Sequence, residues 1–164
     1  MSTSRGGLLA AQCKRGESIA SMASPLNSYA QRVYADRGDA ILARASEDLD
    51  EIEALRREIV AANGKAAGGD AMAARVRRYY GMLSAIEARF PVSKDKAHVS
   101  DLAFTWWDAF RTSKKEKQTN LNFEKAAILF NLGAIHSQQA IESDRTTENG
   151  LKAACREFQQ ASGY

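Results

Sequence analysis

The side chains most able to do chemistry are two histidines and two cysteines, but their spacing argues against a catalytic or metal centre. His98 lies in a polar stretch and His136 in an apolar one, with no His-x3-His or HExxH pair. Cys13 and Cys155 are far apart and form no CxxC or Cys/His pattern. Zinc sites and cysteine nucleophiles need such neighbours. The pattern therefore favours two reduced thiols and a histidine packed in a core.

Other chemical motifs are equally incomplete. The Gly64-Lys65 pair lacks the GxxxxGK(S/T) order that wraps a phosphate, and no GxSxG elbow is present. Glu124 and Glu142 stand too far apart along one expected helix to work as a carboxylate pair. We therefore expect no catalytic residue, no cofactor and no metal, and we expect that the chain is not an enzyme.

Two basic clusters could bind anions. Three arginines at positions 75, 77 and 78 lie beside tyrosines, and we interpret them as a solvated face rather than an anion site. Lys114, Lys115 and Lys117 fall in a stretch, 111–120, that we expect to be a charged loop. Such runs are usually solvated, and weak attraction to acidic lipid headgroups is the alternative. A net charge of +3 is too small for a dedicated nucleic-acid binder.

The composition is that of a soluble globular protein, with 45% hydrophobic and 26% charged residues and only two prolines. The longest apolar run near the start, residues 8–11, is too short for a signal peptide, and nothing approaches the roughly 20 residues of a membrane span. These features predict a cytoplasmic chain whose membrane contacts would be peripheral.

Apolar residues at helical spacing predict five helices. Ser24 as N-cap with Pro25 at the first position marks the first start, and Asp39 is expected to cap the second helix. Asn63-Gly64 is a typical end signal for the second helix, and Thr146 or Thr147 is expected to cap the fifth. The expected helices cover residues 25–37, 39–62, 70–90, 120–142 and 147–162.

Two short β-forming stretches are also present, at residues 8–13 and 101–107. Because the second has no other evident partner, we expect the two to pair and to tie the amino terminus onto the helices. Trp106 and Trp107 would then point to opposite faces, so that one can lie in the core while the other packs on a neighbouring helix or is partly exposed.

The last two helices resemble a tetratricopeptide hairpin, although the loop between them is longer than that repeat allows. Residues 129–136 echo its Leu-Gly segment, and Ala154, Phe158 and Ala161 echo its second helix. His136 takes the place of a packing aromatic residue. Gly133, in mid-helix, is expected to mark the close approach of a neighbouring helix.

Several motifs, in this order and spacing, are similar to the signature of the Bro domain. They are residues 78–80 (RYY), 86–91 (IEARFP), 104–110 (FTWWDAF), 123–134 (FEKAAILFNLGA), 136–138 (HSQ), 150–152 (GLK) and 158–163 (FQQASG). The resemblance runs from about residue 8 to residue 164, and the loop at 144–147 leans toward plant or algal ALIX-like proteins.

This resemblance implies a mainly α fold: a tetratricopeptide-like solenoid with a small antiparallel sheet near the amino terminus. It implies that residues 8–164 are the amino-terminal part of a Bro domain whose carboxy-terminal half is absent, after a disordered segment at 1–7. It further implies a scaffold, peripheral on endosomes, that docks the carboxy-terminal amphipathic helix of Snf7-type ESCRT-III subunits during multivesicular-body and vacuolar sorting.

No partner-binding residue is carried over, because much of the family's known binding surface is expected in the absent half. The signature residues, which we expect to be structural, are Trp106, Asp108, Phe123, Glu124, Lys125, Phe130, Asn131, Gly133 and Ser137.

Two alternatives remain open. The chain could belong to a tyrosine-phosphatase-like multidomain protein, which a downstream Cys-x5-Arg segment would show. It could also belong to a rhophilin-type scaffold with a Rho-binding coiled coil before the Bro domain. Only seven residues precede Leu8, which counts against the second alternative.

Overall fold

The computed structural model describes residues 10–64 and 69–164. The predicted fold class is confirmed: these residues are mainly helical with a small antiparallel sheet. The segment predicted to be disordered, 1–7, lies outside the described residues. The elements in order are α1 (Ala23–Val33), a 3-10 turn (Ala35–Arg37), α2 (Asp39–Ala61), α3 (Gly69–Glu87), β1 (Phe104–Trp107), β2 (Lys115–Gln118), α4 (Leu121–Glu142) and α5 (Glu148–Gly163).

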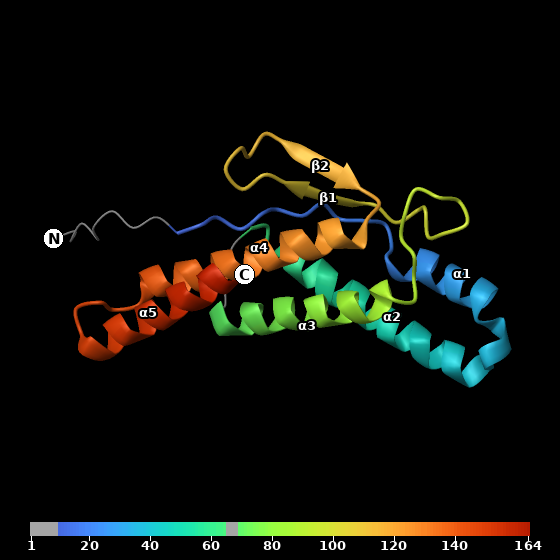
Figure 1. Cartoon of the computed structure of the whole chain (residues 1–164), viewed down its shortest axis with the longest axis horizontal. Coiled ribbons are helices and arrows are strands. Elements are labelled where there is room, and N and C mark those ends of the chain that lie inside the picture. Colours follow the sequence, from blue (N-terminus) through green and yellow to red (C-terminus); the bar gives the residue numbers. More distant parts are fainter. Residues whose placement is uncertain (1–9, 65–68) are drawn as a thin grey trace.

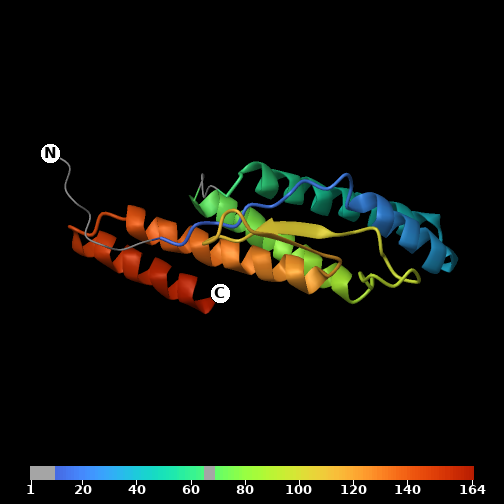
Figure 2. The same cartoon turned by 90° about the horizontal axis from the view of Figure 1, so that it is seen from above.

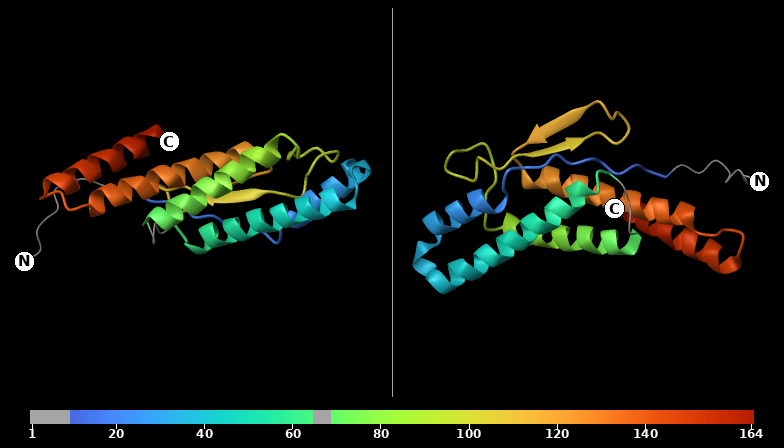
Figure 3. Two further views of the ribbon diagram at one scale, coloured as in Figure 1. Left: turned by 90° about the horizontal axis from the view of Figure 1, so that it is seen from below. Right: turned by 180° about the vertical axis from the view of Figure 1, so that it is seen from behind.

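The helices form an elongated row in which each packs on the next (Figure 1). α1 pairs with α2, α2 with α3, α3 with α4, and α4 with α5. Seen from above, α1 and α2 occupy one end of the molecule and the α4–α5 hairpin the other (Figure 2). The views from below and behind show α3 between these ends and the strands on the opposite side of α4 (Figure 3). Such nearest-neighbour packing is typical of helical solenoids.

The start of α1 differs from the prediction. Ser24 is not its N-cap, because the helix begins at Ala23 and its N-terminus is bound by a side chain of α2. The Glu53 Oε2 accepts hydrogen bonds from the backbone N–H groups of Met22 and Ala23, both at 2.8 Å, and from the Ser21 hydroxyl at 2.6 Å. These bonds, the hydroxyl first, hold the pKa of Glu53 below its usual value. A carboxylate here is favoured by the helix dipole.

The boundaries of α2 and α3 lie close to the predicted ones. Asp39 does not cap α2. The N-cap is Gly38, at φ 89°, which has no side chain to accept a hydrogen bond, and Asp39 is the first helical residue. The end signal is confirmed, since Asn63 and Gly64 have φ of 51° and 75°, the left-handed region in which helices commonly stop. α3 ends at Glu87, three residues before Phe90.

The predicted pairing of residues 8–13 with 101–107 is wrong. β1 pairs antiparallel with β2, with Phe104 opposite Gln118 and Trp107 opposite Lys115. β2 falls in the stretch expected to be a charged loop, and all four of its residues are exposed. A strand without a buried face shows no apolar alternation, so the sequence pattern could not reveal it.

The amino-terminal segment does reach the sheet, but through later residues. Gly16 forms a bridge with Trp106. The Trp107 N–H donates to the Arg15 carbonyl at 2.9 Å, and the Glu17 N–H donates to the Thr105 carbonyl at 3.0 Å. The portion of the expected strand that the structure describes, residues 10–13, instead runs beside α4 (Figure 1).

The core follows the predicted helices. α4 is buried at positions on most of its sides, as its composition predicted, and Asn120 caps it by accepting from the Asn122 N–H. The Thr147 side chain caps α5 by accepting from the Gly150 N–H at 3.1 Å, as expected. In α5, by contrast, only Ala154 is buried. Among the described residues, one face of the last helix is therefore open.

Candidate functional site

Two of the signature residues, Glu124 and Trp106, belong to a network centred on a buried carboxylate in α4. Glu124 is fully buried and accepts from the Arg56 Nε at 3.0 Å, the Tyr79 hydroxyl at 2.9 Å and the Trp106 Nε1 at 2.5 Å. These donors come from α2, α3 and β1, so one carboxylate joins four elements. Burial, followed by the charge of Glu124, raises the pKa of Tyr79 well above its usual value, which keeps this hydroxyl a donor.

Sequence reasoning did not identify the cation of this network. The helical spacing left Leu55 or Arg56 as the core position of α2, and the structure places the guanidinium of Arg56 there, 3% exposed. It lies over the Phe104 ring, 5.5 Å from the centroid, and also donates to the Glu17 carbonyl at 3.1 Å. An arginine at a core position of an acidic helix was the available signal, because a buried charge needs a buried partner.

Asn131 and Ser137 attach the amino-terminal segment to α4. The Asn131 amide accepts from the Lys14 N–H at 2.6 Å and donates to the Lys14 carbonyl at 3.1 Å, as a neighbouring strand would. The Ser137 hydroxyl accepts from the Ala11 N–H at 3.1 Å, and Gln138 Nε2 donates to the Ala11 carbonyl at 2.8 Å. These side chains give an irregular backbone the hydrogen bonds that a sheet would have supplied.

The remaining signature residues also have structural contacts. Lys125 pairs with Glu87 at 2.7 Å, and Phe123 packs against the core. The Asp108 carboxylate accepts from the backbone N–H groups of Arg111 and Phe110, which holds its pKa below the usual value and shapes the β1–β2 turn. That the nine signature residues serve the fold rather than partner binding stays a prediction.

Gly133 and His136 lie where α4 meets α5. A Cβ on Gly133 would stand 3.2 Å from the Ala161 carbonyl oxygen and 3.6 Å from the Tyr164 Cβ. His136 is 2% exposed, with Nδ1 2.6 Å from Glu157 Oε2 and Nε2 2.8 Å from Arg77 Nη2. Both interpretations from sequence are confirmed: the glycine permits close packing, and the histidine is a core residue with satisfied nitrogens.

The arginines of α3 face α2 and α4 rather than a free anion site. Arg75 pairs with Glu58 at 2.9 Å, Arg78 pairs with Glu51, and Arg77 contacts His136. The two ion pairs are exposed, and each is worth little to stability. Two of the three arginines thus have acidic partners on α2, and the third contacts a residue of α4.

Two of the exposed surfaces in the described ranges carry large apolar side chains. The first is the β1–β2 hairpin, where Phe110 is 79% exposed and Arg111, Lys114 and Lys117 are also exposed. Trp107 is partly buried, as expected for one of the paired tryptophans. The Arg15 Cζ and the Lys115 Nζ each lie 5.0 Å from the centroid of its ring. The second is the outer face of α5, where Leu151 is 50% exposed.

The described residues offer neither a metal centre nor a membrane-spanning helix. Within residues 10–64 and 69–164, no cluster of three or more histidine, cysteine or acidic side chains could hold a metal ion. No helix in the same ranges has the length and apolar character needed to cross a membrane.

The model of the BRO1-like domain matches residues 8–164, and the chain belongs to this family. The vacuolar-sorting protein BRO1 of Arabidopsis thaliana is 37% identical over 99% of this chain, which spans 19% of that protein. The programmed cell death 6-interacting protein of Mus musculus is 34% identical over 87% of this chain and 16% of its own length.

The fold of a solved relative agrees. The ALIX BRO1 domain, solved as a complex with CHMP4C, matches 95% of this chain with a TM-score of 0.80 and 31% identity, over 43% of its own chain. The chain thus spans about a fifth of the first of these curated relatives and less than half of the solved domain. Several of its relatives are named as vacuolar-sorting proteins, and the family resemblance expected from the sequence motifs is confirmed.

Proposed function

We propose that this chain is the amino-terminal part of a Bro domain in a sorting scaffold, and that the complete domain docks the carboxy-terminal helix of a Snf7-type ESCRT-III subunit. The observation that carries this proposal is the fold match to the ALIX domain in complex with CHMP4C. Similarity to vacuolar-sorting proteins supports a role in multivesicular-body and vacuolar sorting. The same similarity favours a sorting role over the role of a phosphatase-like or a Rho-binding protein.

The docking mode follows from the solenoid. Rows of amphipathic helices offer grooves in which a partner helix lays its apolar face, with anchors at i, i+3, i+4 and i+7. The open face of α5, with Leu151 50% exposed, supplies an apolar wall for such a groove. This chain covers 43% of the solved domain, so we expect the complete domain to supply the rest of the groove and residues 1–164 alone to bind weakly. The protein acts without catalysis, in the cytoplasm and at the surface of endosomes.

A titration tests this proposal. A labelled peptide of the carboxy-terminal helix of a Snf7-type subunit is titrated into the complete domain and into residues 1–164, at low and high salt. We expect saturable binding by the complete domain that changes little with salt, because apolar contacts are not screened. Absence of saturable binding by the complete domain, together with turnover or binding of a small substrate, would refute the scaffold role.

Peripheral contact with acidic membranes is a second proposal, supported by the exposed hairpin. Phe110 can enter the headgroup region while Arg111, Lys114 and Lys117 lie against anionic lipid, each basic residue contributing about 1 kcal/mol. Sedimentation with vesicles of phosphatidylserine or phosphatidylcholine tests it. Replacing Lys114 and Lys117 with Glu should weaken binding about tenfold or more, whereas Lys152→Glu on α5 should not. Equal loss in both variants would mean that only net charge matters.

A further inference from the structure

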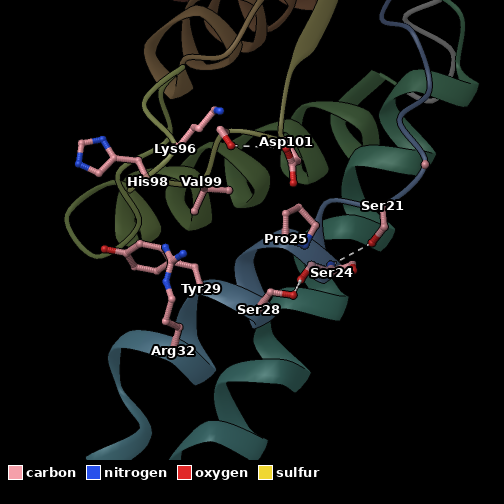
Figure 4. Close-up of a pocket in the computed structure, with 12 residues that line it drawn as sticks. Ser21, Ser24, Pro25, Ser28, Tyr29, Arg32, Lys96, His98, Val99 and Asp101 are labelled. Atoms are coloured by element: carbon pink, nitrogen blue, oxygen red, sulfur yellow. Dashed lines mark hydrogen bonds between the residues drawn. The ribbon is translucent and has the colours of Figure 1, made fainter.

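A groove of about 420 Å³ lies between α1 and the loop that precedes β1. One wall is a face of α1 and the other is formed by residues 96–101 (Figure 4). Tyr29, Pro25 and Val99 give it an apolar floor. The polar residues that line the groove include Ser21, Ser24, Ser28, Arg32, Lys96 and Asp101. The volume is in the range of sites that hold small ligands or short peptide segments.

The charges of the groove are separated along its length. Arg32, Lys96 and His98 lie toward one end, and Asp101 lies next to Pro25, toward Ser21 (Figure 4). Neither Arg32 nor Lys96 forms a salt bridge with any residue in the described ranges. The cationic end therefore has positive charge that the surrounding protein does not neutralise.

The guanidinium of Arg32 is held in place without being neutralised. Its Nη2 donates to the Ala97 carbonyl at 3.0 Å, and its Cζ lies 5.4 Å from the centroid of the Tyr29 ring. These contacts tie α1 to the loop and leave the other N–H groups of the guanidinium as donors. An arginine whose orientation is fixed in advance loses less entropy when it binds an anion.

We propose that this groove binds an extended peptide segment that carries a phosphorylated side chain and, a few residues away, a basic side chain. The phosphate lies against Arg32 and Lys96, where a guanidinium and an ammonium can each donate to its oxygens. The Ser24 and Ser28 side chains line the path between the two ends. The basic side chain pairs with Asp101.

The helix sets the spacing of the two charges on the ligand. Pro25 and Arg32 are seven residues apart on α1, which is about 10 Å at 1.5 Å per residue. An extended peptide covers about 3.3 Å per residue, so three or four residues separate the phosphate from the basic side chain. An isolated phosphate or a lipid headgroup would use one end only and would meet repulsion from Asp101 at the other. The charge pattern thus favours a peptide.

Fluorescence anisotropy with the full chain tests the phosphate end. The probe is a labelled alanine-based peptide with one phosphoserine and an arginine four positions away, made in both sequence orders. We expect saturable binding to one order, displaced by inorganic phosphate only at about tenfold or higher excess. Arg32→Met and Lys96→Met should each weaken it about tenfold, the loss of one charge-assisted bond. Arg44→Met, which removes an exposed arginine of α2 outside the groove, should have no effect.

A charge reversal tests the other end and separates the proposal from its alternatives. Asp101→Arg should abolish the preference for the arginine peptide and create one for a peptide with glutamate at that position. Lys96 and Asp101 are exposed, so these variants should keep the wild-type melting temperature. No saturable binding, equal weakening by Arg44→Met, or binding only to vesicles containing phosphorylated lipid overturns the proposal. Equal affinity for phosphate and peptide also overturns it.

Discussion

Arg56 in α2 and Glu124 in α4 form an ion pair in the core, with the Arg56 Nε 3.0 Å from the Glu124 Oε1 and exposed fractions of 3% and 0%. The two helices that carry them are separated in the chain by α3 and both strands. Tyr79 and Trp106 donate to the same carboxylate, so its charge is balanced by one cation and two neutral donors. This pair therefore ties α2 to α4 across the core of the described residues.

Replacing Glu124 with Gln should destabilise the domain by about 3–5 kcal/mol, because the guanidinium of Arg56 is then buried without a counter-charge. Urea unfolding at pH 7 measures the loss. The double variant Arg56→Met/Glu124→Gln should recover a large part of the stability, since an apolar side chain suits the buried position. A matched control, Glu148→Gln, breaks the exposed pair with Lys152 and should cost at most about 1 kcal/mol. Equal costs for the two single variants would contradict the buried role.

A side chain at Gly133 should destabilise the α4–α5 contact. Gly133→Leu is expected to cost about 1–3 kcal/mol through overpacking, although leucine is the better helix former, because its Cβ would stand 3.2 Å from the Ala161 carbonyl. Gly81→Ala on α3 is the control. Nothing lies within 4 Å of a Cβ there, so this variant should gain up to about 1 kcal/mol. Thermal melting of both compares them, and stabilisation by leucine at 133 would disprove the close contact.

Loss of the Asn131 amide should release the amino-terminal segment from α4. In Asn131→Ala, the N–H and carbonyl of Lys14 lose their partners, and we expect a cost of about 1–3 kcal/mol. Hydrogen exchange should accelerate at Lys14 while the amides in the middle of α4 stay protected. Asn27→Ala, which removes an α1–α2 side-chain bond to Ser46, should leave exchange at Lys14 unchanged. Unaltered exchange at Lys14 in Asn131→Ala would show that other contacts hold the segment.

The helices could be predicted because each has a local signal. The apolar spacing of α2 and α4 and the turn at Asn63-Gly64 depend on neighbours in sequence. The partner of β1 could not be predicted, because β2 has four exposed polar residues and is specified by pairing with β1 rather than by its own pattern. The cap of α1 was missed for a similar reason, since Glu53 is contributed by another helix.

The buried network around Glu124 also combines residues that sequence motifs could identify with residues that they could not. The family motif pointed to Glu124 and Trp106, but nothing local linked either of them to Arg56 or Tyr79, which lie 68 and 45 residues before Glu124. The groove between α1 and residues 96–101 has no sequence motif at all. Tertiary packing brings its Arg32, Lys96 and Asp101 together, and their spacing along the chain carries no information about that.

The two cysteines should differ sharply in reactivity. Cys13 is 8% exposed, and its thiol donates to the Asn131 carbonyl, whereas Cys155 is exposed on α5. At pH 8 a thiol reagent should label one cysteine quickly, and Cys155→Ser should abolish that rapid phase. Labelling of Cys13 should need unfolding, because burial keeps it protonated and inaccessible. Fast labelling of both thiols in the native protein would show that the amino-terminal segment opens readily.

The Cys13 thiol should also cause a loss of stability at alkaline pH. Burial raises the pKa of Cys13 from 9.0 to about 11, so between these values the folded chain keeps a proton that the unfolded chain has lost. The unfolded state then binds fewer protons, and stability falls as pH rises. The contribution is complete below pH 9 and is lost by about pH 11, amounting to roughly 2–3 kcal/mol.

Urea unfolding of wild type and Cys13→Ala from pH 8 to pH 11 isolates this contribution, because tyrosines and lysines titrate equally in both. Cys155→Ala should follow wild type. A difference between wild type and Cys13→Ala that is constant from pH 8 to pH 11 would show that the thiol ionises normally.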